Sequence, residues 1–534
     1  MKKYRRITAL ICAILMMTAL CACESTNPDD YYIDGKSAGK DLGIISAADN
    51  LFTINCDKGY SFNPLVATNT NNQLVCNLVY ENMVELDNSY NVKPNLITSW
   101  ETADGITWTF HVDSERYFHD GSKMSAYDVA YSLLCAGSSA RYKSRFYSLS
   151  SSYATDANTF VVTLSKSNML FPMLLCIPVI KSGSISASYP QGTGPYTYSK
   201  NLDYLSAFKK YPGYENLPVD KIYLSEYEGG LETISAFEDS LVDVVMNDPT
   251  APTNLGYGTA NEVRGYNTTN MHYIGFNAYS RLFSDARMRL AMQYAFDREY
   301  LKAQMGGYAE ATAIPVNPAC AWYSKELNEE FSYNPAVCRN IFKGLGFEDC
   351  DDDGYMEMKD SADSYSEINI RLLVCSDSSA KVSTARKFAK DMDEMGVQVT
   401  LMEYAWSQYM DALNAGNFDM YYAETRINPD FDITPIAASD GMLNYGSWSS
   451  ASVDSALRAY LKAGAEDRVK ASEDMCRTLC NDGGIITLCF EKHQMITHRG
   501  VITGVKVNEN NPLANVANWK ISFADGIKDT GKKD

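Results

Sequence analysis

The sequence reads Trp108-Thr-Phe-His-Val112, then Tyr117-Phe-His-Asp-Gly121, then Ser125-Ala-Tyr-Asp-Val129. The first segment alternates apolar and polar residues, which predicts a strand with one buried face. Asp104-Gly105, just before it, predicts a hairpin turn. The glycine of the second segment suits a left-handed turn. The third segment begins with a capping box, in which a serine and an aspartate three residues later start a helix.

Similar local patterns lie before and after this stretch. Ser284 is expected to cap a helix whose apolar face runs from Met288 to Phe296. Strand and helix patterns alternate without a strict internal repeat. The other segments of interest are Val79-Tyr-Glu-Asn-Met-Val-Glu-Leu-Asp87, Lys93-Pro-Asn-Leu-Ile-Thr-Ser-Trp100, Gly192-Thr-Gly-Pro-Tyr196, Ile274-Gly-Phe-Asn277, Phe283-Ser-Asp-Ala-Arg287 and Ala295-Phe-Asp-Arg298.

In this order, the segments resemble the large extracellular solute-binding proteins that serve peptide and nickel ABC importers, often called family 5. The resemblance covers most of residues 50–520. It implies an α/β, periplasmic-binding-protein-like clamp of the class II type, with two lobes and an extra inserted subdomain. The ligand is expected between the lobes, where its higher affinity for the closed form drives closure.

The resemblance also implies where the lobes begin and end. Lobe one is expected from residues 44–78, 192–272 and 488–534. The inserted subdomain is expected at residues 79–191, and lobe two at residues 273–487.

The first 22 residues have the pattern of an export signal. Basic residues precede an apolar run from Ile7 to Leu20, which is too short to span a bilayer. Leu20-Cys21-Ala22-Cys23 then resembles the bacterial lipobox, so Cys23 is expected to become the mature N-terminus and to carry a diacylglyceryl group. The alternative is an ordinary secretory signal that is cleaved nearby. Residues 23–43 are expected to form a flexible tether.

The composition is that of a globular protein with an acidic surface. Of the 534 residues, 46% are apolar, and the formal net charge is −19. This length suggests about two to four domains. An acidic body repels nucleic acid, and no basic stripe with interleaved aromatic residues is present, so we expect no nucleic-acid partner. No segment after the N-terminal run is long and apolar enough to cross a membrane.

The main candidates for ligand contact lie in Asn417-Phe-Asp-Met-Tyr-Tyr-Ala-Glu-Thr-Arg-Ile-Asn-Pro-Asp-Phe-Asp432. Peptide-binding relatives carry an aspartate here that pairs with the ligand's ammonium group. Glu424, Asp430 or Asp432 is the candidate in this chain, although the relatives' acidic-aromatic-proline pattern is not reproduced. Arg426 offers a bidentate partner for a ligand carboxylate. The alternative interpretation is that Glu424 and Arg426 neutralise each other.

Further side chains are candidates for the wall of the ligand site. Trp406, which follows Glu403-Tyr-Ala, is expected to form a shelf under a ligand side chain. Asn444, Tyr445 and Trp448 are expected to line the cleft. All of these residue types are also common in cores and loops, so ordinary packing is the alternative interpretation.

No motif indicates catalysis, a cofactor or a metal centre. The sequence lacks a Gly-x-Ser-x-Gly elbow, a Gly-Lys-Ser phosphate loop and a His-x-x-x-His pair. Asp349-Cys-Asp-Asp-Asp-Gly354 fits the start of an EF-hand loop, but position twelve is Asp360 rather than glutamate, so a solvated turn is favoured over a calcium site. Eleven cysteines follow Cys23, an odd number, and buried free thiols are expected.

We therefore expect a monomeric lipoprotein on the outer face of the bacterial cell membrane. It is expected to capture a peptide or peptide-like solute and to deliver it to an ABC permease with its ATPase, without covalent chemistry. One alternative is a surface-anchored hydrolase, such as a peptidase or an esterase. The other is a sensing or adhesion module that shares the fold.

Overall fold

The computed structural model describes residues 51–523, apart from 252–253, 255, 259–260 and 362–363. The expected signal peptide, the tether and Cys23 lie outside the described residues. Within them, no helix has both the length and the apolar character that a membrane crossing needs. The lobe boundaries expected above stay a prediction.

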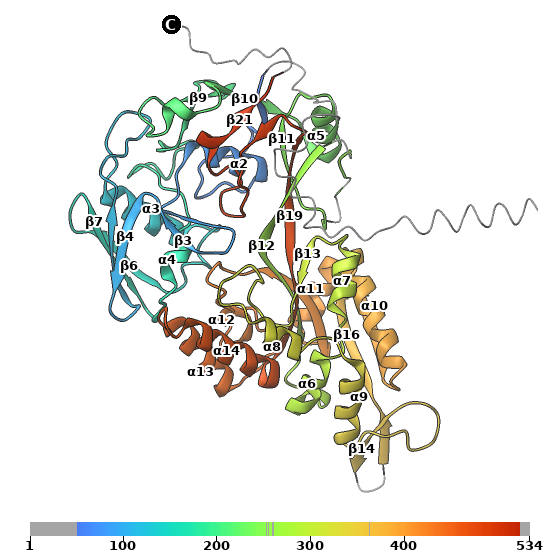
Figure 1. Cartoon of the computed structure of the whole chain (residues 1–534). Helices are drawn as coiled ribbons and strands as arrows, with labels where there is room; N and C mark the ends of the chain where they lie inside the picture. Colours follow the sequence, from blue (N-terminus) through green and yellow to red (C-terminus); the bar gives the residue numbers. More distant parts are fainter. Residues whose placement is uncertain (1–50, 252–253, 255, 259–260, 362–363, 524–534) are drawn as a thin grey trace, which may run out of the picture. The chain divides into compact units, whose positions relative to one another are not determined.

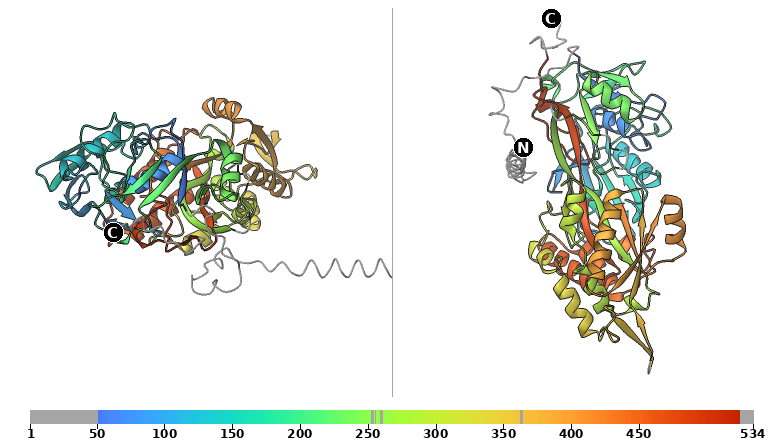
Figure 2. Two further views of the ribbon diagram at one scale, coloured as in Figure 1. Left: turned by 90° about the horizontal axis from the view of Figure 1, so that it is seen from above. Right: turned by 90° about the vertical axis from the view of Figure 1, so that its right-hand side faces the viewer.

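A sheet of 11 strands runs through the described residues (Figure 1). Two long antiparallel strands, β12 and β19, lie side by side at its centre (Figure 2). In spatial order the strands are β17 (Gln398–Tyr404), β16 (Asn369–Cys375), β18 (Met420–Arg426), β12 (Asn261–Phe276), β19 (Ile485–His498), β11 (Val244–Asn247), β1 (Thr53–Cys56), β10 (Lys221–Glu226), β9 (Tyr204–Ala207) and β8 (Tyr196–Tyr198), and β13 (Ala309–Ala311) pairs with β19.

A separate sheet contains the segment from Trp108 to Val112. Its order is β4 (Ile97–Thr102), β5 (Thr107–Val112), β7 (Thr159–Leu164) and β6 (Leu149–Ala154). Three further strand pairs are β2 (Val84–Leu86) with β3 (Val92–Pro94), β14 (Glu357–Ser361) with β15 (Ser364–Glu367), and β20 (Ile502–Thr503) with β21 (Lys520–Ile521).

The helices cover these sheets. They are α2 (Thr70–Val79), α3 (Ala126–Ser138), α4 (Phe171–Leu174), α5 (Gly229–Glu238), α6 (Ala286–Gln293), α7 (Arg298–Gln304), α8 (Lys325–Glu330), α9 (Pro335–Gly344), α10 (Ser379–Asp393), α11 (Trp406–Asn414), α12 (Thr434–Ala437), α13 (Ala451–Lys462) and α14 (Arg468–Asp482). Short 3-10 turns lie at Tyr214–Asn216, Leu282–Ser284 and Val516–Asn518.

The local predictions for residues 104–129 are confirmed. Trp108, Phe110 and Val112 are buried on one face of β5. Gly105 has a φ of 68° in the turn between β4 and β5, a conformation that favours glycine. The Ser125 N–H donates to the Asp128 carboxylate at 3.0 Å, which is the reciprocal bond of a capping box.

The prediction for the cap of α6 was wrong by one residue. Ser284 ends a 3-10 turn, and its hydroxyl donates to the carbonyl of Arg281 at 2.9 Å. Asp285 caps the helix instead, because its carboxylate accepts the N–H of Arg287 at 2.8 Å.

Two motifs that lie far apart in the sequence meet at His119. Its N–H donates to the carbonyl of Gly192, and its Nε2 lies 3.0 Å from the carbonyl of Gly194. Because a carbonyl only accepts, Nε2 carries the hydrogen. A Cβ on Gly192 would lie 2.2 Å from the carbonyl oxygen of Val79, so this close passage requires glycine. His119 and Gly192 therefore join the separately recognised segments into one structure.

His119 gives the protein a predicted sensitivity to acid. Burial lowers the pKa of His119 to about 4, against about 6.5 in an unfolded chain. Between these values the unfolded chain binds more protons, so this histidine's contribution to stability is lost as pH falls from about 6.5 to about 4. In His119→Gln the side chain still donates a hydrogen bond but does not titrate, so we expect a smaller loss of stability over this range. Urea unfolding at several pH values measures this, and equal losses in both proteins would contradict it.

Candidate ligand-binding site

The directions of the strands bring the ends of two strand groups together. β1, β10 and β11 form one parallel group, and β16, β17 and β18 form the other. The two groups run in opposite directions, because β11 is antiparallel to β19, β19 to β12, and β12 to β18. Strand β12 provides a common reference for both groups. The first group reaches its carboxyl end at the level of Gly265, and the second group reaches its carboxyl end at the level of Asn270. The carboxyl ends of both groups therefore face each other, which is where α/β sheets bind ligands.

A pocket of about 640 Å³ lies where these ends meet. One wall is the segment after β11, residues 249–251 with Asn254, and a second is the turn after α7, residues 304–306 with Tyr308. The third wall is residues 376–380, which run from the end of β16 into the first turn of α10. Serine and threonine hydroxyls are prominent in this lining, so the pocket is suited to a polar solute.

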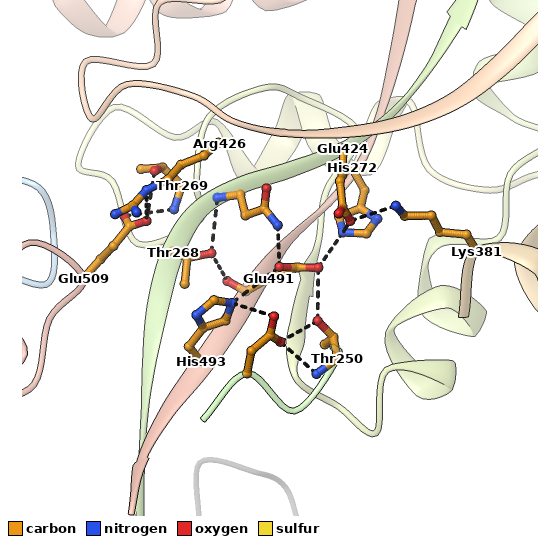
Figure 3. Close-up of polar contacts among 12 residues, drawn as sticks. Thr250, Thr268, Thr269, His272, Lys381, Glu424, Arg426, Glu491, His493 and Glu509 are labelled. Atoms are coloured by element: carbon orange, nitrogen blue, oxygen red, sulfur yellow. Dashed lines mark hydrogen bonds and ion pairs between the residues drawn. The ribbon is translucent and has the colours of Figure 1, made fainter. Parts of the chain in front are cut away.

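Glu424 lies near the carboxyl end of β18 and forms two ion pairs (Figure 3). Its Oε2 is 3.0 Å from Nζ of Lys381 in α10 and 3.1 Å from Nε2 of His272 on β12. Burial raises the pKa of Glu424, but the hydrogen bond with His272 and the charge of Lys381 outweigh it and lower the pKa to about 2. The carboxylate is therefore charged at neutral pH, and 40% of the side chain is exposed.

His272 connects Glu424 to a second carboxylate, Glu491 on β19. The Nε2 of His272 is 2.7 Å from Oε1 of Glu491, and both side chains are buried. The amide of Asn270 donates to the other oxygen of Glu491, and the hydroxyl of Thr250 lies 3.1 Å from Oε1. Burial lowers the pKa of His272, but its bonds with the two glutamates outweigh this and raise it. A charged network thus joins β12, β18 and β19 beside the pocket.

Arg426 has a separate partner near the C-terminus. Its Nε is 2.9 Å from Oε1 of Glu509, whose carboxylate also accepts the N–H and the hydroxyl of Thr269. The Glu509 side chain is 8% exposed and that of Arg426 is 59% exposed. Glu424 and Arg426 therefore do not neutralise each other: each pairs with a different residue, and the guanidinium stays accessible to solvent.

The family model for bacterial extracellular solute-binding proteins, family 5 (Middle), matches residues 91–442, well over half of the chain. This chain belongs to family 5. The oligopeptide-binding protein AppA of Bacillus subtilis is 21% identical to it, over 97% of this chain and 99% of AppA.

Solved structures show the fold of this family 5 protein. A nickel ABC transporter structure from Bacillus halodurans overlaps 88% of this chain and 99% of its own, with a TM-score of 0.71 at 17% identity. AppA of Bacillus subtilis in complex with a nonapeptide overlaps 88% of this chain and 98% of its own, with a TM-score of 0.61 at 20% identity. The fold is the two-lobe clamp of periplasmic solute-binding proteins, which confirms the predicted fold class.

The two aspartates predicted to meet a ligand are buried in this solute-binding protein. Oδ2 of Asp430 accepts the amide of Asn168 at 2.9 Å, and Oδ2 of Asp432 accepts the hydroxyl of Tyr147 at 2.7 Å. Burial and the charge of Asp432 raise the pKa of Asp430. Both aspartates thus connect the segment after β18 to residues 147–168. Of the three acidic candidates for ligand contact, Glu424 has the most exposed side chain.

The remaining predicted contacts differ in exposure. The Trp406 side chain at the start of α11 is exposed and stacks on Tyr409 with ring centroids 5.9 Å apart. The amide of Asn444 donates to the carbonyls of Ala438 and Trp448, so it holds its own turn. Tyr445 is half-buried and packs edge-on against Tyr421. Trp406 is therefore the most accessible shelf of this group, and its contact with a ligand stays a prediction.

Sequence reasoning missed the partners of the charged candidates. His272, Lys381, Glu491 and Glu509 belong to no motif, and each lies more than 40 residues from the candidate that it contacts or supports. One local signal was present: Glu491 and His493 are two residues apart in a strand pattern, which places both side chains on one face.

Two other expectations concern cysteines and the acidic loop. The 11 cysteines of the described residues are free, and all are buried except the half-buried Cys135 and the exposed Cys350. In the acidic loop, the exposed Asp349 accepts the N–H groups of Asp353 and Gly354. One ligand atom from each of Asp349, Asp351, Asp353 and Glu357 lies within 4.8 Å of the others, so the solvated turn stays a prediction beside the calcium alternative.

Proposed function

We propose that this family 5 protein captures a peptide or a peptide-like cationic or zwitterionic solute and delivers it to an ABC permease with its ATPase. The observation that carries the proposal is the pocket at the facing carboxyl ends of the two strand groups. The relationship to an oligopeptide-binding protein along almost the whole chain supports the peptide class. Binding between two lobes suits import, because closure excludes water and opening releases the solute unchanged.

We further propose that Cys23 carries a lipid that holds the protein, as a monomer, on the outer face of the cell membrane. The basic, apolar and lipobox segments in this order support the anchor. The same proposal divides the described chain into lobe one, the inserted subdomain and lobe two at the boundaries expected from the sequence. In whole cells, incorporation of radiolabelled fatty acid into the protein but not into Cys23→Ala tests the anchor.

We propose that the solute reaches from this pocket, which neither residue lines, to the end of β18, where Glu424 meets its ammonium group and Arg426 its carboxylate. Both side chains are charged and exposed near the carboxyl end of β18. They lie two residues apart, which places them on the same face of the strand. In the ligand-bound state, the carboxylate of Glu424 contacts the solute's ammonium group as well as His272 and Lys381.

The test is calorimetric titration with short peptides, after mass spectrometry has identified what co-purifies with the protein. We expect a stoichiometric complex with unaltered peptide, and about tenfold weaker binding in Glu424→Gln, because a hydrogen bond to a charged group is lost. Blocking the peptide's ammonium by acetylation should weaken binding to the wild type but much less to the variant. Glu330→Gln, which changes an exposed glutamate on α8, is the matched control.

Different outcomes separate the alternatives. Hydrolysis of the peptide by the pure protein would support the surface hydrolase. Equal affinity of Glu424→Gln and the wild type for a peptide with a free N-terminus would end the role of Glu424. A protein that binds no peptide and supports no uptake in cells would instead support a sensing or adhesion role.

A further inference from the structure

A second polar set lies between strand β19 and the end of β11, beside the charged network. β11 and β19 pair with Asn247 opposite Gln494, so the next residues along each strand, Asp248 and His493, face each other. Glu491 lies on the same face of β19 as His493, because residues two apart on a strand point the same way. Asp248, Glu491 and His493 thus come together from two strands, with their ligand atoms all within 4.8 Å of one another.

The distances within this set are unusual for hydrogen bonds. Nε2 of His493 lies 3.5 Å from Oε2 of Glu491 and 3.6 Å from Oδ2 of Asp248. Both distances exceed the usual range for hydrogen bonds, and within the described residues this buried nitrogen has no hydrogen-bond partner. A tetrahedral metal ion with bonds of about 2.1 Å holds its ligand atoms about 3.4 Å apart. The distances from His493 to the two carboxylates therefore match the spacing of ligands that share one cation, and the two carboxylates lie within 4.8 Å of each other.

We propose that Asp248, Glu491 and His493 bind a divalent transition-metal ion, with Zn²⁺ as the best-suited probe. One imidazole nitrogen and two carboxylate oxygens form a common donor set for this class of ion. Calcium and magnesium prefer oxygen ligands alone, so the imidazole nitrogen of His493 favours a transition metal over either of them.

Neighbouring residues hold two of the ligands, Asp248 and Glu491, in place (Figure 3). The N–H and hydroxyl of Thr250 lie 2.9 and 2.7 Å from Oδ1 of Asp248, which leaves Oδ2 directed toward His493. Asn270 and His272 orient the carboxylate of Glu491. Such supporting bonds are typical of metal sites, where they set the orientation of the ligands.

The site is open to ions from solvent and adjoins the pocket. The side chains of Asp248 and His493 are 36% and 28% exposed. Thr250, which contacts two of the ligands, also lines the pocket. A bound ion would thus fix the segment after β11 to strand β19 at the edge of the pocket. This inference is independent of the proposed function, because solute capture does not require the ion.

The experiment titrates the purified, chelator-stripped protein with Zn²⁺ by calorimetry and with Co²⁺ by visible absorption. We expect about one equivalent of Zn²⁺ and the absorption bands of a tetrahedral Co²⁺ complex. Both His493→Ala and Asp248→Asn should weaken Zn²⁺ binding about tenfold or more, because each removes a ligand. His111→Ala, which changes a histidine on β5 far along the chain from these strands, is the matched control and should bind as the wild type does.

Two outcomes would overturn the metal site. One is a wild-type protein that binds no Zn²⁺, in which case His493 is an imidazolium ion that both carboxylates share. The other is unchanged affinity and an unchanged Co²⁺ spectrum in His493→Ala. Circular dichroism shows whether that variant is folded, and if it is not, His493→Gln decides the question, since its amide fills a similar space but is a poor ligand.

Discussion

Gly446→Ala is expected to lower the free energy of unfolding by about 3 kcal/mol or more. A Cβ at Gly446 would lie 1.7 Å from the carbonyl oxygen of Phe276, which belongs to the backbone and cannot rotate away. The same glycine accepts the N–H of Ala278 at 2.8 Å, so its turn is held against the end of β12. The added methyl group must therefore separate two backbone segments that are hydrogen-bonded to each other.

The expected loss extends to the predicted ligand wall. Gly446 directly follows Asn444 and Tyr445, so displacement of the turn moves Tyr445 away from Tyr421. Chemical denaturation measures the change in stability, and peptide titration measures the change in affinity. Gly464→Ala is the matched control, because a Cβ there meets no atom within 4 Å. A loss of less than about 1 kcal/mol in Gly446→Ala, similar to that of the control, would contradict the prediction.

His272→Ala is expected to cost about 3 kcal/mol or more, because it removes one partner of a buried ion pair. Glu491 is 5% exposed at its side chain and would keep its charge with Asn270 and Thr250 as hydrogen-bond neighbours and with the more distant His493 at 3.5 Å. Glu424 would lose the same contact but keeps Lys381 and some solvent. The penalty therefore arises mainly at Glu491.

A double-mutant cycle measures the interaction energy between His272 and Glu491 apart from their contacts with other residues. Glu491→Gln removes the charge that His272 compensates, so the double variant should be more stable than the sum of the two single losses predicts. We expect a coupling energy of about 1–3 kcal/mol from urea unfolding at neutral pH. His111→Ala, an exposed histidine, is expected to be close to neutral. A coupling energy near zero would show that the two side chains contribute independently.

Local structure was largely predictable because its causes are local. The hairpin at residues 104–105, the buried face of β5 and the cap at Ser125 depend on alternation and on hydrogen bonds between near neighbours. The misplaced cap of α6 shows the limit of this reasoning. Ser284 and Asp285 are both good caps, and the 3-10 turn that precedes the helix selected the second.

The candidate site was predictable only in its outline. Glu424 and Arg426 were predicted as partners for a ligand's charged groups; the structure leaves both side chains exposed, and their contact with a ligand stays a prediction. Asp430 and Asp432 have the same chemistry and lie only a few residues away. They are nevertheless buried against Asn168 and Tyr147, because the chain turns inward after β18.

The sequence by itself determined the α/β class, individual elements such as β5 and α3, and membership of a clamp-forming family, since these depend on periodicity and on motifs that short segments contain. Only the tertiary structure decided which charges meet. Lys381, His272 and Glu509 reach Glu424 and Arg426 from distant parts of the chain. The physical reason is that the energy of an ion depends on its neighbours in space and on its burial, and both are set only when the sheet has formed.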